Sequence, residues 1–256
     1  MRISLPAAAD PSSVGSALRE AIRTTLEPPV LVPTFNNPTY TARMVAQLAA
    51  WKVPEIVVLD NASTFRPMIR LLRRLARKGI TVVDLGANRG PRYVLSEPEV
   101  LAGLPEVFMF TDPDIAFHPA MPPRFWETLH SVSEHARVGK VGLALDISDP
   151  SVLRTEKFDI SDAQYTIVEW ETQFWADREP LPNGVEGYLA PVDTTFALCN
   201  QRYFSPDDFY TAVRLAGEYT ARHLPWYTRT RIPRGELEFY KRTQTASYYS
   251  LAGARR

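Results

Sequence analysis

The chain has 256 residues, of which 45% are hydrophobic and 23% are charged. A chain of this size and composition can bury a full core in one large domain. Lysine plus arginine and aspartate plus glutamate each total 29, and the formal net charge of zero gives no global field that would attract nucleic acid. The single cysteine, Cys199, excludes an internal disulfide and is expected to be a buried thiol in a reducing compartment.

Residues 1–29 are expected to form an N-terminal helical extension. Ser12 or Ser13 can cap this helix, and its apolar stripe consists of Val14, Leu18, Ala21, Ile22 and Leu26. We expect the stripe to dock on the protein or to face a partner, for example in a homo-oligomer. No apolar stretch is long enough to span a bilayer, so we expect a cytoplasmic protein without a transmembrane segment. Peripheral attachment at the inner membrane face is the weaker alternative, because the stripe is short.

From residue 30 onwards, apolar segments alternate with segments of helical periodicity. The pattern predicts strands within 30–38, 55–63, 80–91, 106–115 and 140–148, and helices within 39–53, 67–79 and 125–139. This alternation indicates an α/β fold with a mostly parallel central sheet that is flanked by helices. Beyond about residue 150 the regularity ends. There we expect a strand within 187–199, antiparallel or mixed, and a helical tail from residue 235 to 250.

Two aspartates separated by one proline close the fourth expected strand, in the stretch FMFTDPDI. Asp112 and Asp114 lie two positions apart, so in extended backbone both carboxylates point the same way and can meet one cation. Such oxygen ligands suit Mg²⁺ or Mn²⁺, which commonly bridges carboxylates and substrate phosphates. The alternative is a turn with both acids in water. Their position at the carboxyl edge of the sheet, where ligands bind in α/β folds, favours the metal site.

The succession VPTFNNP, VVLDNAS, GANRGP and FMFTDPDI resembles the GT-A fold glycosyltransferases, in particular the family 2-like enzymes. The resemblance covers residues 30–150 well and the rest loosely. It implies a Rossmann-like donor-binding half at 30–150 and a smaller acceptor-binding half with a C-terminal helical tail at 151–256, in one compact unit. The implied activity is that of a metal-dependent, inverting hexosyltransferase, which moves a sugar from a UDP- or GDP-linked donor to a carbohydrate or small-molecule hydroxyl, as in polysaccharide biosynthesis.

The resemblance also implies where the donor and the metal bind. The expected donor contacts are Thr34, Phe35, Asn36, Asp60, Asn88, Arg89, Arg92 and Asp112, where the two arginines are our own candidates for phosphate contacts. Asp112 and Asp114 are the expected metal ligands, and many members of this fold class add a histidine near the C-terminus. His223 is the candidate for that ligand. Alternatively, its imidazole packs a turn against Trp226 and Tyr227.

An inverting transfer needs a general base across from the metal. We favour Asp193 at the start of an apolar strand, where burial would raise its pKa, and then Glu171; Glu169 is a third candidate. The sequence departs from the family pattern because no Glu-Asp pair follows the acceptor strand. The acidic pair Asp207 and Asp208 is instead expected to begin a helix.

Three other functions share parts of this pattern. A D-x-D phosphatase carries its aspartates on the first strand, whereas here they follow three earlier strand–helix units. A sugar nucleotidyltransferase opens with a glycine-rich loop that VPTFNNP lacks. A non-catalytic nucleotide-sugar or carbohydrate-binding module remains the main alternative, because the sequence identifies no single base.

Overall fold

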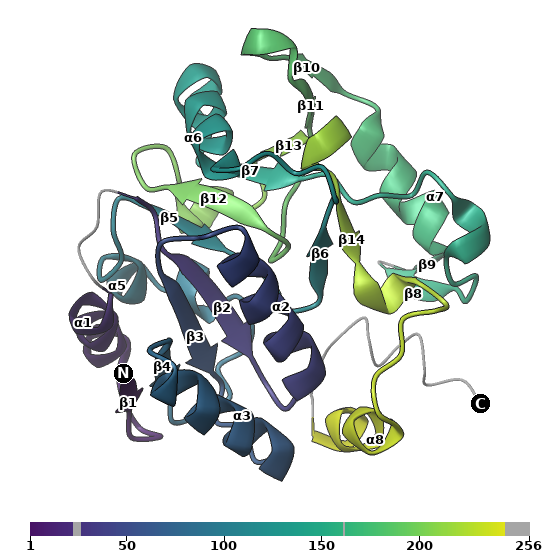
Figure 1. Cartoon of the computed structure of the whole chain (residues 1–256). Helices are drawn as coiled ribbons and strands as arrows, with labels where there is room; N and C mark the ends of the chain where they lie inside the picture. The colour runs from purple at the N-terminus through teal and green to yellow at the C-terminus, as the bar shows by residue number, and fades with distance from the viewer. Residues whose placement is uncertain (23–26, 161, 244–256) are drawn as a thin grey trace.

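The computed structural model describes residues 1–22, 27–160 and 162–243, and its centre is a ten-stranded sheet (Figure 1). In spatial order the strands are β1 (Arg2–Ser4), β4 (Thr81–Asp84), β3 (Ile56–Asp60), β2 (Val30–Thr34), β5 (Val107–Phe110), β12 (Ala197–Asn200), β7 (Lys140–Leu143), β13 (Val213–Leu215), β11 (Glu186–Leu189) and β10 (Arg178–Pro180). The half from β1 to β5 is parallel throughout. Beyond it, β12 runs antiparallel to both neighbours, and β7 pairs in parallel with β13. The expected α/β class is confirmed.

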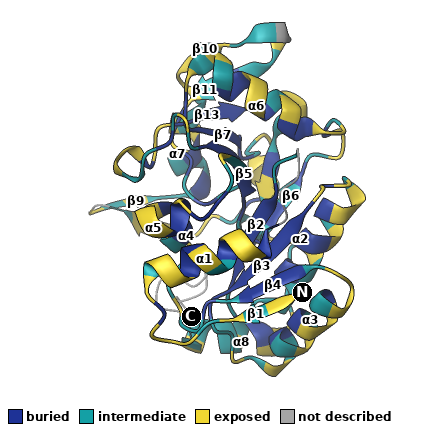
Figure 2. Ribbon diagram, turned by 90° about the vertical axis from the view of Figure 1, so that its left-hand side faces the viewer, coloured by how far each residue is buried: buried dark blue, intermediate teal, exposed yellow. Residues whose placement is uncertain are grey.

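Helices cover both faces of the sheet because its strands alternate between two cores. Val30 and Val32 belong to the core under α2 (Pro38–Ala50), α3 (Arg66–Arg77) and α6 (Phe125–Ala136). Leu31 belongs instead to the core under α1 (Pro11–Ala21), α4 (Tyr93–Ser96) and α5 (Pro98–Leu101). Successive strand residues point to opposite faces, so a run that is apolar at every position is buried on both sides. Figure 2 shows the central strands in dark blue and the outer faces of the helices in yellow.

The N-terminal helix α1 is docked on the protein. Val14 and Leu18 are fully buried, and α1 packs against α5 so closely that a Cβ at Gly15 would lie 2.4 Å from the carbonyl oxygen of Glu99. The helix cap is Asp10, whose carboxylate accepts from the backbone N–H of Ser13, and not Ser12 or Ser13 as expected. The expected stripe residue Leu26 lies outside the described residues. The described part of the stripe therefore has no free apolar face for a partner or a membrane.

The second half contains short elements that extend and cover the sheet. They are β6 (Ile115–Phe117) with β14 (Ala221–His223), the hairpin of β8 (Phe158–Ile160) and β9 (Ala163–Tyr165), α7 (Ile167–Thr172), and α8 (Arg234–Thr243). Single turns of 3-10 helix lie at Pro150–Val152, Gln173–Trp175, Pro182–Gly184, Pro206–Asp208, Gly217–Tyr219 and Leu224–Trp226. The single strand expected within 187–199 is wrong. The segment forms β11 and β12, which are separated in the sheet by β7 and β13, because the chain turns between them.

Helix α8 joins the C-terminal part of the chain to the first two strand–helix units. Glu236 is buried, and its carboxylate accepts from both the backbone N–H and the hydroxyl of Thr39, at 3.0 and 2.6 Å, in the first turn of α2. The ring of Phe239 stacks on Phe65, at 4.7 Å between centroids, just ahead of α3. The part of the expected tail beyond residue 243 lies outside the described residues.

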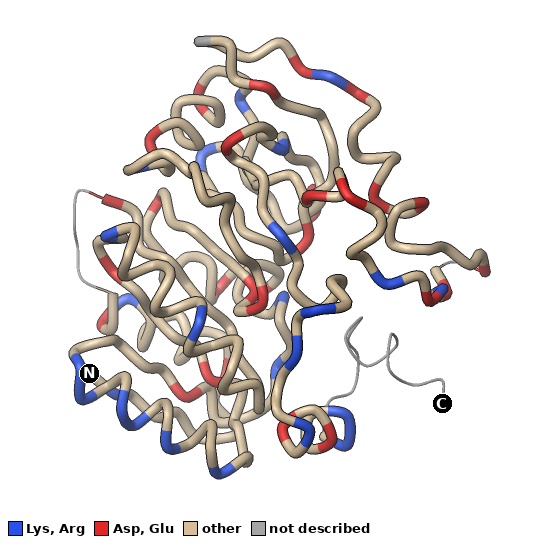
Figure 3. The backbone as a smooth tube through the Cα atoms, turned by 45° about the vertical axis from the view of Figure 1, so that its right-hand side comes forward, with Lys and Arg blue, Asp and Glu red and all other residues tan. Residues whose placement is uncertain are grey.

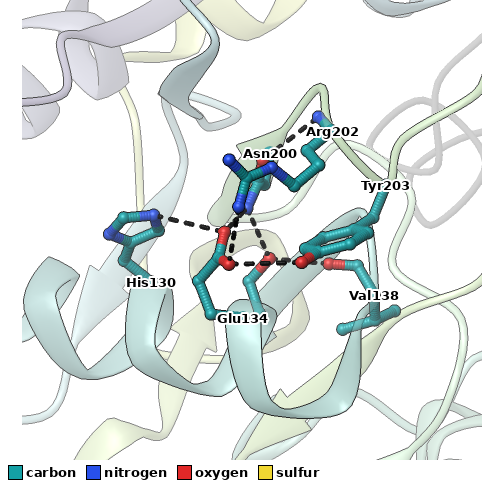
Figure 4. Close-up of polar contacts among 7 residues, drawn as sticks. His130, Glu134, Val138, Asn200, Arg202 and Tyr203 are labelled. Carbon is teal, nitrogen blue, oxygen red and sulfur yellow. Dashed lines mark hydrogen bonds and ion pairs between the residues drawn. The ribbon is translucent and has the colours of Figure 1, made fainter.

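A polar cluster ties α6 to the far end of β12, at the sheet edge opposite Asp112 (Figure 4). The buried amide of Asn200 donates to Ser133 at 3.2 Å and to Glu134 at 2.8 Å. The carboxylate of Glu134 also accepts from Arg202 and Tyr203. These polar groups bond to one another and lie away from the strand ends that carry the candidate site. We therefore assign them a structural role, which is to hold α6 in position.

Candidate functional site

Three adjacent strands end on polar side chains in register. Thr34 on β2 pairs with Asp60 on β3, which pairs with Asp84 on β4. Burial raises the pKa of Asp60 to about 6, with a further contribution from the like charge of Asp84, although two weak hydrogen bonds from Ser63 oppose the shift. Asp84 was not among the sequence candidates. Asp84 is the last residue of TVVD, as Asp60 is the last residue of IVVLD, and this shared pattern could have identified Asp84.

The loop after β2 is held by its own polar side chains. Thr34 is 2% exposed, and its hydroxyl bonds to Asn37 and Thr41, each at 2.6 Å. Asn36 is fully buried in a left-handed conformation; its amide oxygen accepts two backbone N–H groups at the start of α3, and its amide nitrogen donates to Thr243 on α8. Both expected donor contacts are therefore engaged by the protein. Phe35, which follows Thr34, is partly exposed.

The loop after β4 separates its two candidate arginines. The guanidinium of Arg89 is bound by the carbonyl oxygens of Leu85 and Ala9 and by the Tyr93 hydroxyl, so it is directed into the protein. Asn88 is exposed, and its side-chain oxygen accepts from the N–H of Gly90 in the same turn. Among the described residues of this loop, Arg92 is the candidate that extends toward the aspartate pair.

Arg92 forms a two-pronged ion pair with Asp193, a residue 101 positions away in sequence. Its Nε donates to Asp193 at 2.7 Å and its terminal nitrogen bonds the second carboxylate oxygen. The Asp193 contact raises the pKa of Arg92, and the charge of Asp112 contributes in the same direction. Arg92 and Asp193 are each about half exposed, so they remain accessible to a ligand. The structure thus brings a candidate base and a candidate phosphate contact together beside Asp112.

Asp112 is held in place by Thr194, which sequence reasoning missed. The Thr194 hydroxyl donates to the carboxylate at 2.7 Å, and the Asp112 N–H donates to the carbonyl of Thr194 at 2.9 Å. Burial raises the pKa of Asp112 well above its usual range, and the like charge of Asp114 adds to the shift. Thr194 directly follows the candidate Asp193, and this adjacency was the available signal.

His223 reaches Asp114 because β14 pairs antiparallel with β6, placing His223 opposite Ile115. Its Nε2 lies 3.5 Å from Asp114 Oδ1, and the N–H of Leu224 donates to the Asp114 carbonyl at 2.8 Å. The imidazole also packs edge-on against Trp226, at 4.9 Å between ring centroids. Both expected roles of His223, near the metal ligands and in a packed turn, are therefore compatible with its position.

The residues around Asp114 offer a partial ligand set for a divalent cation. Among residues 1–22, 27–160 and 162–243, no group of three or more His, Cys, Asp or Glu side chains has the geometry of a metal site. However, Asp114 Oδ1 and His223 Nδ1 are buried and have no hydrogen-bond partner among the residues that the structure describes. Mg²⁺ is usually held by one or two carboxylates plus substrate phosphates. Asp112, Asp114 and His223 are therefore the side chains that could contribute to a cation site, if other oxygen atoms completed the coordination.

The other two candidate bases have separate environments. Glu171 on α7 is 1% exposed and forms an ion pair with the buried Arg214 of β13. Burial raises the pKa of Glu171 to about 7, while the Arg214 and His223 charges oppose the shift. Glu169 is exposed, and its carboxylate accepts from the N–H of Thr166 in a capping box, which lowers its pKa. That hydrogen bond makes Glu169 a poor base. The sequence contained a signal for this ion pair, because Arg214 is a charged residue within the apolar segment AVRLA and a buried charge requires a partner.

Lys140 is fully buried beneath the segment that carries Asp193 and Thr194. Its ammonium donates to the carbonyl oxygen of Val192 and lies 4.0 Å from the centroid of the Phe209 ring. Burial lowers its pKa to about 8, against the opposing effect of nearby Asp193. Sequence reasoning overlooked this lysine, although a charged residue opening the apolar strand KVGL was a usable signal.

No model of a known protein family matches this sequence, and no curated protein matches it. Several solved structures resemble it in fold. The mannosyltransferase PcManGT from Pyrobaculum calidifontis, in complex with GDP-Man and Mn²⁺, has 17% identity and a TM-score of 0.48, over 91% of this chain and 72% of its own. S. aureus TarS 1–349 with UDP-GlcNAc has 16% identity and a TM-score of 0.42, and the match covers 76% of this chain and 51% of TarS 1–349. GalNAc-T7 with UDP, GalNAc and Mn²⁺ has 12% identity and a TM-score of 0.46, and the match covers 84% of this chain and 48% of GalNAc-T7. At these identities the likeness concerns the fold alone.

Proposed function

We propose that the protein is a glycosyltransferase of the hexosyltransferase type. In this proposal it moves a sugar from a nucleoside-diphosphate sugar to a carbohydrate or small-molecule hydroxyl, with Mn²⁺ or Mg²⁺ as cofactor. The observation that carries the proposal is the convergence at Asp112 and Asp114 of two residues distant in sequence, Thr194 and His223. Two partly buried carboxylates at a sheet's carboxyl edge repel each other, and a divalent cation relieves that repulsion.

In the proposed site each residue has a separate task. Asp112, Asp114 and His223 would hold the cation, which when bound supplies positive charge to the departing diphosphate. Arg92 lies close enough to Asp112 to bind a phosphate oxygen, and its planar guanidinium suits that contact. Asp193, released from Arg92 by the phosphate, is then free to accept the proton of the acceptor hydroxyl. Asp60 and the partly exposed Phe35 would contact the nucleoside end.

A non-catalytic nucleotide-sugar module is the second candidate, for a specific reason. Both leading base candidates, Asp193 and Glu171, are held by arginines, and an ion-paired carboxylate is a weaker base. A protein that only binds the donor needs neither carboxylate to be free. The two functions differ in turnover, since a transferase hydrolyses its donor slowly when no acceptor is present.

Replacement of Asp114 by alanine tests the metal assignment. We expect Asp114→Ala to abolish Mn²⁺-dependent binding of UDP- and GDP-linked sugars, measured by calorimetry, because it removes one of the two carboxylates proposed to hold the cation. Asp177→Ala is the matched control, since Asp177 is an exposed aspartate away from the site. Release of nucleoside diphosphate by the wild type separates transferase from module. Undiminished Mn²⁺-dependent binding by Asp114→Ala would refute the metal site.

A further inference from the structure

Helix α3 carries a continuous row of exposed cations. Arg70, Arg73, Arg74 and Arg77 lie within the helix, with Arg66 at its start and Lys78 directly after its end. At 3.6 residues per turn these six side chains occupy roughly 140° of the helix circumference over about 18 Å. Figure 3 shows blue segments recurring along α3 without an intervening red one. We name this row the α3 basic stripe.

The stripe has no acidic counterpart in the described part of the chain. None of its six side chains forms an ion pair there, whereas other exposed arginines, such as Arg124, Arg178 and Arg202, do. Several members lie four residues apart, and like charges at that spacing destabilise a helix. Because the chain as a whole is neutral, the stripe is a local segregation of charge. The helix dipole favours Arg74, Arg77 and Lys78 at the C-terminal end of α3. It does not explain Arg66, Arg70 and Arg73, which lie nearer the N-terminal end.

The rest of α3 fixes the direction in which the stripe points. Met68, Leu72 and Leu75 are buried on the opposite side of the helix, beneath which lie the sheet and α2. The stripe thus faces outward from a helix whose opposite side is anchored in the core. The half-buried Phe65 ahead of it is stacked on Phe239, so it is not a free platform for a nucleobase.

We propose that the α3 basic stripe docks the protein on the surface of a membrane rich in anionic lipids. A row of evenly spaced cations matches an extended, flat array of negative headgroups better than one compact anion. Clusters of four to eight basic residues on an amphipathic helix are the sequence pattern for such surfaces. Sequence-specific or single-stranded nucleic acid is disfavoured, because the stripe offers neither free aromatic rings nor amide side chains for bases. Non-specific binding to duplex phosphates is distinguished by the test below. This docking does not depend on the proposed catalytic function.

Docking through α3 would orient the candidate site. The helix starts directly after the loop in which the N–H of Ser63 donates to Asp60, so Arg66 lies six residues after Asp60 of the proposed nucleoside end. In the docked state the stripe runs along the bilayer, with its Arg66 end toward the carboxyl edge of the sheet and its Lys78 end toward the opposite edge. An acceptor carried by a lipid would then approach the site from the Arg66 end of the helix.

Sedimentation with lipid vesicles tests the proposal. We expect the wild-type protein to bind phosphatidylcholine vesicles that contain phosphatidylglycerol, and not vesicles of phosphatidylcholine alone, with binding lost at high salt. The triple variant Arg70→Gln, Arg73→Gln, Arg77→Gln should bind roughly ten- to a hundredfold more weakly, given the usual contribution of each basic residue. The matched control is Lys157→Gln, Arg229→Gln, Arg231→Gln, which removes the same charge from exposed positions outside α3.

Three outcomes would overturn the proposal. These are failure of the wild type to bind anionic vesicles, an equal loss in the control triple, and binding to duplex DNA or polyphosphate without binding to vesicles. Circular dichroism and thermal melting of both triples establish that the fold is intact. Because vesicle binding is measured without any sugar donor, failure of docking and failure of the glycosyltransferase proposal are distinguishable.

Discussion

At the scale of single residues, the two leading base candidates differ in how readily a ligand can reach them. Asp193 and Arg92 are half exposed and lie beside Asp112, whereas Glu171 and Arg214 are almost entirely buried. An incoming phosphate can therefore compete for Arg92 but has no comparable access to Arg214. This difference in accessibility makes Asp193 the better candidate for the base.

Conservative amide variants of the two acids test this assignment. We expect Asp193→Asn to lower the rate of donor hydrolysis by about 10²–10⁴-fold, the usual contribution of a general base. Mn²⁺-dependent donor binding should survive, because the metal ligands are intact. Glu171→Gln should keep most of the hydrolysis rate in protein whose melting curve shows that it is folded. A larger rate loss in Glu171→Gln than in Asp193→Asn would reverse the assignment.

Asp60 should make the stability of the protein depend on pH. Its pKa in the folded state is raised by burial from 3.8 to about 6, so the folded state binds a proton that the unfolded state releases. Stability from this group is therefore highest below pH 4 and falls as the pH rises through 6. Asp60→Asn, which cannot ionise, should gain about 1–3 kcal/mol relative to wild type between pH 4 and pH 7. Urea unfolding at the two pH values measures the difference; a difference independent of pH would contradict the burial argument.

At the scale of elements, the polar cluster of Figure 4 holds α6 against β12. Asn200→Ala should destabilise the protein by about 1–3 kcal/mol, because Asn200 is fully buried and its amide satisfies Ser133 and Glu134. Arg202→Ala should change stability little, since its ion pair with Glu134 is exposed to solvent. Chemical denaturation of both variants provides the comparison. Equal effects would mean that the exposed ion pair contributes as much as the buried amide, which would contradict the prediction.

The first half of the fold was predictable because its signals are local. The strands expected within 30–38, 55–63, 80–91 and 106–115 correspond to β2, β3, β4 and β5, and the helices between the first three to α2 and α3. Apolar runs and helical periodicity depend only on neighbouring residues. The expected strand within 187–199 failed because pairing partners, not propensity, decide whether an apolar segment continues as one strand. Residues 190–196 instead form the connection that presents Asp193 and Thr194.

At the scale of the whole molecule, the candidate site is built from long-range contacts. Thr194 lies 82 positions from Asp112, and Arg92 lies 101 positions from Asp193. Sequence reasoning proposed Asp112, Asp114, His223, Arg92 and Asp193 as candidates, and the structure places these residues near one another. It could not anticipate that Asn36 and Arg89 would be engaged by the protein, because their partners come from α8 and from the N-terminal segment.

The attachment of α8 has a consequence for shortened forms of the protein. A chain that stops before Arg234 keeps every proposed ligand and acid, yet the backbone N–H of Thr39 loses its acceptor in Glu236 and the ring of Phe65 loses its cover. The first turn of α2 and the entry to α3 would loosen together. Truncation before Arg234 would thus disorganise the proposed nucleoside end, although the cut is far from it in sequence. A loss of activity in such a form would then reflect a local folding defect and not the removal of a catalytic group.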